Sequence, residues 1–365
     1  MGLLSSLADR ALNRTAAGGA LPASPAALDL HRSQPIVDLV VGTALFRRDL
    51  LRPARRGHVD LPRARAAGVN VLGLTVATRF PDLDGRLSAL HFGSLGLRRP
   101  HSRSDIEIAT WLIDRIHGWV ERSGGALRLL QSPVDLDAAL APDGPLGVFI
   151  GVQGGHALSG DPANVALLRR RGVLMLAPAH VMDNALVGSS TGRQAGGLTA
   201  HGREVIAAAQ QAGMAVDLAH MSLSGIEQAM PLMREPFTLS HTGIIELSGR
   251  SSRWRRYSAA TRNVPASVVA EVGRAGGIVG TILATDLLGG SRLSDAAFAV
   301  RRMAQLAGPD QAALGSDMDG ALRMVIDVAG LPALSDELLR AGTDRSVVER
   351  VMGGNAARLL RGVIG

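Results

Sequence analysis

The sequence predicts an α/β protein with the (β/α)8 TIM-barrel fold. Two observations lead to this prediction: eight short, nearly continuous apolar runs recur along the chain, and segments of helical periodicity lie between most of them. Strands that are buried on both faces of a parallel sheet have such continuous apolar runs. Eight strands with intervening helices match the barrel, and a doubly wound open sheet is the alternative.

The expected elements follow one another from about residue 36 to the end of the chain. Strands are expected at 36–41, 69–76, 146–152, 173–176, 214–218, 237–239, 277–283 and 312–314. Helices are expected at 105–122, 162–171, 200–212, 222–233, 265–275, 295–306 and 335–341. We expect residues 1–34 to form an N-terminal arm with one weak helix, and residues 35–365 to form a single barrel domain.

Composition excludes several kinds of chemistry. The 365 residues contain no cysteine and no lysine, and 46% of them are hydrophobic. Disulfides, thiolate nucleophiles, lysine Schiff bases and a carbamylated lysine between two metals are therefore excluded.

The charge pattern argues against a nucleic-acid partner, and the hydropathy pattern argues against a transmembrane segment. The net charge is +7, but the arginines are scattered and aromatic residues make up only 3%. Four arginines within 250–256 are better explained by a solvated loop or a clamp for an anionic ligand. No apolar run is long enough for a transmembrane helix, and charged residues at 9, 10 and 14 interrupt any signal-peptide core. We therefore expect a cytoplasmic protein.

Polar residues follow several of the expected strands, where the active site of a barrel lies. Gln153 and His156 follow the third strand, and Asp317 follows the eighth. Three histidines, His180, His220 and His241, follow the fourth, fifth and sixth strands. Such matched positions would seldom arise from a random scatter of histidines.

The residue types at these positions allow metal chemistry, with plainer alternatives. Neutral imidazoles of His220 and His241 on adjacent strands suit zinc, whereas the alternative is two hydrogen-bonded loop histidines. Asp317 could bind a metal or take a proton from water, or it could form an Asx turn. Arg262, which precedes a helix, could bind a substrate carboxylate or could be solvated.

Taken together, the motifs resemble the membrane (renal) dipeptidase family, zinc peptidases with amidohydrolase-like barrels. The resemblance covers the chain from about residue 36 to its end, and the order and spacing of its segments make it specific. These segments are 152–158 (VQGGHAL), 197–204 (GLTAHGRE), 213–220 (GMAVDLAH), 240–241 (SH), 261–265 (TRNVP), 314–320 (LGSDMDG) and 353–358 (GGNAAR).

The resemblance implies a role for each candidate residue. The family holds two zinc ions bridged by a glutamate, and His220 and His241 match the two histidines that bind one of them. His180 resembles the family histidine that contacts substrate and the tetrahedral intermediate. Arg262 matches the arginine that binds the substrate carboxylate, and Asp317 matches the aspartate near the scissile bond.

The sequence departs from the family at three ligand positions. Val40 and Gly42 stand where the first strand of the family carries a metal-binding histidine and aspartate, and Gln153 stands at the bridging glutamate. A valine and a glycine have no donor, and the neutral amide of Gln153 offers only a weak one. Compared with the two-zinc site of the family, a site that lacks one zinc ion and two carboxylates keeps roughly the same net charge. We therefore expect this chain to bind at most one zinc ion.

These observations lead to three functional hypotheses. The first is a hydrolase of dipeptides or related small amides, with one zinc on His220 and His241, weakly aided by Gln153. In this hypothesis Asp317 acts as general base and acid, His180 stabilises the oxyanion, and Arg262 binds the substrate carboxylate. The alternatives are a catalytically inactive binding or scaffold protein, and other small-molecule chemistry in the same pocket. The family resemblance also suggests a homodimer.

Overall fold

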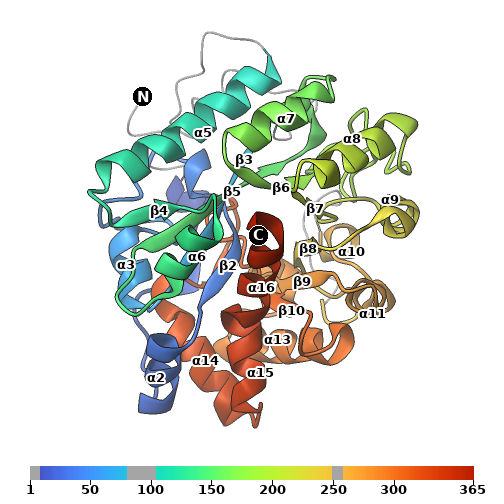
Figure 1. Ribbon diagram of the computed structural model, residues 1–365. Helices are drawn as coiled ribbons and strands as arrows, with labels where there is room; N and C mark the ends of the chain where they lie inside the picture. Colours follow the sequence, from blue (N-terminus) through green and yellow to red (C-terminus); the bar gives the residue numbers. More distant parts are fainter. Residues whose placement is uncertain (1–8, 80–103, 249–257) are drawn as a thin grey trace.

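The computed structural model describes residues 9–79, 104–248 and 258–365, and it contains the expected barrel. Eight parallel strands form the ring at the centre of Figure 1. They are β2 (Val37–Val41), β3 (Val71–Ala77), β5 (Leu146–Gln153), β6 (Val173–Ala177), β7 (Ala215–Asp217), β8 (Phe237–Thr242), β9 (Ile278–Thr281) and β10 (Ala312–Leu314). All eight predicted strands are therefore confirmed, and every residue in them is buried.

The ring closes between the first strand and the segment that follows the last one. The backbone N–H of Asp317 donates to the carbonyl of Val40 at 3.1 Å, and Gly42 N–H donates to the Met318 carbonyl at 2.7 Å. Seven strand pairs in the order β10-β9-β8-β7-β6-β5-β3-β2 complete the sheet. The closure places residues 317–318 against the end of β2.

Helices surround the strands, and their starts follow local capping rules. Ser132 and Asp135 form a capping box at the start of α6 (Pro133–Leu140), and Asp60 accepts the Arg63 N–H at 2.9 Å at the start of α3 (Leu61–Ala66). The longer helices are α2 (Pro25–Ser33), α5 (Asp105–Arg122), α6 (Pro133–Leu140), α7 (Ala163–Arg170), α8 (Ala200–Gln211), α11 (Ala266–Arg274), α13 (Leu293–Ala307), α14 (Leu331–Arg340) and α16 (Asn355–Ile364). The shorter ones are α3 (Leu61–Ala66), α9 (Leu223–Ala229), α10 (Ala259–Arg262), α12 (Thr285–Leu288) and α15 (Arg345–Glu349).

Helix α16 covers one end of the barrel and crosses in front of the strands in Figure 1. Its apolar residues Ala356, Leu359, Leu360 and Val363 are spaced for a single helical face. They belong to one buried cluster with residues near the start of the strands, such as Val37, Val71, Ala215, Ile278 and Ala313. This end is therefore filled with apolar side chains, and the polar strand ends lie at the opposite end.

Three short strands lie outside the predicted set. In the predicted arm, β1 (Thr15–Ala17) pairs in parallel with β11 (Met324–Ile326), and β4 (Leu127–Leu129) extends the sheet beside β5. The division into an arm (1–34) and a barrel domain (35–365) stays a prediction. Among the described residues, none of the helices is both long and apolar enough to cross a membrane.

Candidate active site

The predicted site residues lie at the carboxyl ends of the strands or in the segments that follow them. Gln153 ends β5, His241 lies in β8, and Arg262 ends the short helix α10. His180, His220 and Asp317 follow β6, β7 and β10. All six side chains are buried, and His180 is the most exposed at 8%.

His220 and His241 form the centre of this group. Their Nε2 atoms lie 3.0 Å apart, and the Gln153 side-chain amide lies 3.5 Å from His241 Nε2. The His180 ring contacts the His220 ring edge-on, with centroids 4.7 Å apart. The sequence-based expectation that the two histidines on neighbouring strands converge agrees with these distances.

A buried relay sets the tautomer of His241. Ser240 Oγ donates its proton to Asp217 Oδ2 at 2.6 Å, so at 2.7 Å it can only accept from His241 Nδ1. His241 therefore carries its proton on Nδ1 and presents the lone pair of Nε2 to His220. Support of this kind orients metal-binding histidines. This relay could not be predicted from the sequence, because Asp217 and Ser240 are brought together only by the register of strands β7 and β8.

The same arrangement recurs beside Asp317. Asp38 on β2 accepts the backbone N–H of Ser316 at 2.9 Å and also the Ser316 hydroxyl. In both cases a buried carboxylate holds the serine that immediately precedes a candidate site residue. The two supports fix the backbone on which His241 and Asp317 stand.

Burial keeps the imidazoles neutral. Desolvation lowers the pKa of His180 to about 4, and it lowers the pKa of His220 and His241 well below the ordinary value, aided by the charge of Arg262. His180 Nδ1 lies 3.3 Å from the Arg79 carbonyl, which can only accept. The His220 Nδ1 atom is buried, and no described residue offers it a hydrogen-bond partner.

Arg262 is a buried cation beside the histidines. Only 1% of the residue is exposed, and its Nη2 donates to the His241 carbonyl at 2.7 Å. Its Nε is buried and has no hydrogen-bond partner in the part of the chain that the structure describes. Within residues 9–79, 104–248 and 258–365, no carboxylate lies within ion-pair distance of it. A buried guanidinium in this state is suited to an anionic ligand.

Asp317 has an unusual backbone and an unusual pKa. Its φ is +59°, in the left-handed region that non-glycine residues rarely adopt. Burial raises the pKa of its carboxyl to about 7; Asp38 adds to this shift, whereas Arg262 opposes it. A carboxyl group that titrates near neutrality is suited to general acid–base catalysis.

The sequence analysis identified three positions that differ from the family's expected metal ligands, and two of them, Val40 and Gly42, offer no donor in this fold. Val40 is fully buried in the apolar cluster that α16 covers. At Gly42 an added Cβ would lie 2.5 Å from the Asp319 carbonyl oxygen and 2.9 Å from its carbon. The backbone after β10 therefore fills the space that a side chain at position 42 would need. Among the described residues, no group of three His, Cys, Asp or Glu side chains could hold a metal.

A cavity of about 340 Å³ opens beside His156, the histidine that follows β5. Burial lowers the pKa of His156. The cavity is lined by Arg79, Ser104, Asp105, Gly155, His156, Ser159, Gly160, Asn184, Ala185, Leu186 and His201. The arginine group within 250–256 lies outside the described residues.

Sequence comparison relates the chain to the membrane dipeptidase family and to proteins named dipeptidases. The family model for membrane dipeptidase (peptidase family M19) matches residues 25–364. Dipeptidase verJ of Clonostachys rogersoniana is 26% identical over 258 residues, which cover 69% of this chain and 64% of that protein. Dipeptidase tcpJ of Claviceps purpurea is 25% identical over 319 residues, 84% of this chain and 69% of that protein. The chain thus matches about two thirds of the length of these relatives.

Solved structures share the fold. A probable dipeptidase, PvdM, from Pseudomonas aeruginosa superposes with a TM-score of 0.76 at 16% identity, over 93% of this chain and 97% of that one. A metallopeptidase from Rhodobacter sphaeroides, bound to a phosphinate mimic of L-Ala-D-Ala, gives 0.73 at 22% identity, over 90% and 99%. Because the family model matches residues 25–364 of the 365 in this chain, the chain belongs to the membrane dipeptidase family, peptidase family M19.

Proposed function

We propose that this protein hydrolyses dipeptides or related small amides, using at most one zinc ion at His220 and His241. The observation that carries the proposal is the buried Arg262 guanidinium beside the two histidines, without a carboxylate in ion-pair distance among the described residues. A free C-terminal carboxylate would neutralise this cation, and it would bring the preceding amide toward the histidines.

The donor set supports one ion and not two. The converging Nε2 atoms of His220 and His241, 3.0 Å apart, are compatible with bonds of about 2.0–2.1 Å to one zinc. Gln153 would add a weak third ligand once its amide is turned to direct the oxygen at the ion. A second ion would need donors where Val40 and Gly42 stand. A zinc ion at His220 and His241 would polarise a substrate carbonyl and lower the pKa of a bound water.

Proton transfer, substrate binding and oxyanion stabilisation are assigned to side chains of the protein. Asp317, with its pKa raised to about 7 by burial, takes a proton from the attacking water and returns it to the leaving amine. Arg262 holds the substrate carboxylate. In the structure His180 Nδ1 lies 3.3 Å from the Arg79 carbonyl, an arrangement that favours a proton on Nδ1. To donate to the developing oxyanion, neutral His180 would have to carry its proton on Nε2 and give up the hydrogen bond to Arg79.

The test combines metal content with turnover of a dipeptide panel and of the same dipeptides with amidated C-termini. We expect at most one zinc per chain, lost in His220→Ala and retained in His117→Ala, a histidine on α5 that bonds to a backbone carbonyl instead. The wild type should prefer the free carboxylate, and Arg262→Met should lose that preference. Two zinc ions per chain, or turnover that survives His220→Ala, would overturn the proposal.

A catalytically inactive binding protein is the second candidate. It is favoured by the lack of a third His, Cys, Asp or Glu ligand among the described residues. Under this alternative, dipeptides bind through Arg262 and are released unchanged, so calorimetry detects binding while no dipeptide is cleaved. A cytoplasmic location, a homodimer and the lack of a nucleic-acid partner stay predictions.

A further inference from the structure

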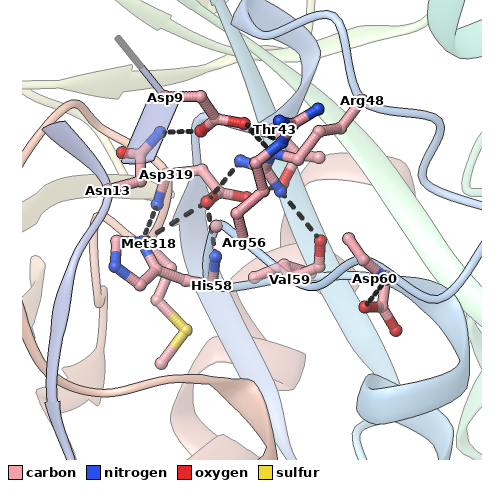
Figure 2. Close-up of polar contacts among 12 residues, drawn as sticks. Asp9, Asn13, Thr43, Arg48, Arg56, His58, Val59, Asp60, Met318 and Asp319 are labelled. Carbon is pink, nitrogen blue, oxygen red and sulfur yellow. Dashed lines mark hydrogen bonds and ion pairs between the residues drawn. The ribbon is translucent and has the colours of Figure 1, made fainter. Parts of the chain in front are cut away.

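A buried charge network lies directly behind Asp317, and the proposed reaction does not use it. Its centre is Asp319, which is fully buried two residues after Asp317. Asp319 Oδ1 lies 2.6 Å from Arg48 Nη2 and accepts the backbone N–H of His58 at 2.7 Å, while Oδ2 accepts the Thr43 hydroxyl at 2.7 Å. Figure 2 shows Asp319 enclosed between Arg48 and His58.

The network also fixes the backbone of Asp319. Its N–H donates to His58 Nδ1 at 2.8 Å, and the other ring nitrogen of His58 donates to the Arg14 carbonyl at 3.1 Å. Side chain and main chain are thus both tied to the segment after β2. Because both ring nitrogens of His58 are engaged, its ring orientation is set as well.

The network continues to the far side of the same loop. Arg48 Nε pairs with Asp9 at 2.9 Å, and Asn13 Nδ2 donates to Asp9 at 2.8 Å. Asn13 Oδ1 in turn accepts the Ala321 N–H at 3.0 Å. With Arg56 Nε at 3.6 Å from Asp9, two arginines balance two buried aspartates. This balance allows the charges to be buried.

Residues 317–321 adopt a backbone that needs such support. Asp317, Asp319 and Ala321 have φ of +59°, +61° and +63°, in the region that side-chain-bearing residues rarely adopt. All five backbone N–H groups of the segment are hydrogen-bonded, to Val40, Ser316, His58, Asp317 and Asn13. A Cβ on Gly320 would lie 2.3 Å from Asp317 Oδ1, so this loop backbone directly abuts the Asp317 carboxyl.

We propose that Asp319 is a positioning residue for Asp317: the Arg48–Asp319–His58 network holds residues 317–321, three of which have a left-handed backbone, in place and so fixes the position of the Asp317 carboxyl. The proposal rests on the proposed function for the role of Asp317. If the network is weakened, the strained backbone relaxes and the carboxyl moves away. A displacement of about 1 Å from the productive geometry can cost roughly a hundredfold in rate.

The first test is independent of activity. Hydrogen exchange of residues 317–321 is compared in the wild type, Asp319→Asn and Asp327→Asn. Asp327 is a matched control, because it is also buried, pairs with Arg63 at 2.8 Å, and bonds to Gly19 and Ala329 instead of this loop. We expect exchange at least roughly tenfold faster in Asp319→Asn alone. Unchanged exchange in that variant would overturn the proposal.

The second test uses turnover. Asp319→Asn should lower kcat by roughly ten- to a hundredfold with KM within about twofold, while Asp327→Asn should leave both near the wild type. In an Asp317→Asn background, Asp319→Asn should cause no further loss, because it acts through Asp317. Equal losses in both backgrounds would overturn the proposal. If the wild type cleaves no dipeptide, the proposed function fails, and the exchange experiment alone decides on positioning.

Discussion

Replacing Gly42 with alanine should destabilise the protein strongly, although the backbone conformation at this position is open to any residue. Gly42 has φ of −87° and ψ of 13°, so the cost comes from contact and not from backbone strain. The new Cβ would lie 2.5 Å from the Asp319 carbonyl oxygen. Residues 317–320 would have to move away from β2 by several tenths of an ångström or more.

The magnitude follows from what that movement breaks. Overpacking of a tight site costs about 1–3 kcal/mol. The two hydrogen bonds that close the barrel here, from Asp317 to Val40 and from Gly42 to Met318, each contribute about 1 kcal/mol. Allowing for partial relaxation, we expect the free energy of unfolding to fall by about 2–4 kcal/mol.

Urea unfolding followed by circular dichroism measures this change. The matched control is Gly196→Ala, because a Cβ at Gly196 meets no atom within 4 Å. The control should change stability by less than about 0.5 kcal/mol. If Gly42→Ala is as stable as the control, residues 317–320 do not fill the space beside β2, and the reasoning is wrong.

Three further predictions concern the metal site, the pH dependence and the covered end of the barrel. Restoring the family's donors together, as Val40→His, Gly42→Asp and Gln153→Glu, should not raise the zinc content above one ion per chain by mass spectrometry, since the space at position 42 is filled. If Asp317 is the base, kcat/KM should rise with pH around a midpoint near 7, because only the ionised carboxylate accepts a proton and burial has raised its pKa to about 7; a flat profile over this range would contradict that role. Leu360→Ala should cost about 2–5 kcal/mol of stability in urea unfolding through the cavity left in the α16 cluster, and a change below 1 kcal/mol would show that α16 packs loosely.

The sequence was sufficient to predict the positions of the barrel strands and to predict that His180, His220 and His241 lie at their carboxyl ends. Each barrel strand is a short apolar run, so its position could be predicted within a few residues, and the residue after it could be assigned to the site. Helix α16 was not among the expected helices, although its apolar residues have helical spacing. Its position over the starts of the strands depends on tertiary packing and could not be predicted. The three-residue strands β1, β4 and β11 are too short to give a periodic signal.

The supporting contacts of the site could not be predicted. Asp217 meets Ser240 through strand register, and Asp38 meets Ser316 across the closure of the ring. Asp319 and Arg48 are far apart in the chain, and their pairing depends on how two loops pack. Residue type predicted which side chains could do chemistry, whereas their orientation depends on partners distant in sequence.

The contact at Gly42 also bears on how such a site can change over evolutionary time. With this loop packing, a single substitution cannot introduce an acidic side chain at position 42 without strain, since its Cβ would collide with the Asp319 carbonyl. The loop would first have to retract, which would break the barrel closure at Val40 and Met318. A side chain gained at position 42 before the loop moved would therefore lower stability, so packing alone favours retention of the glycine.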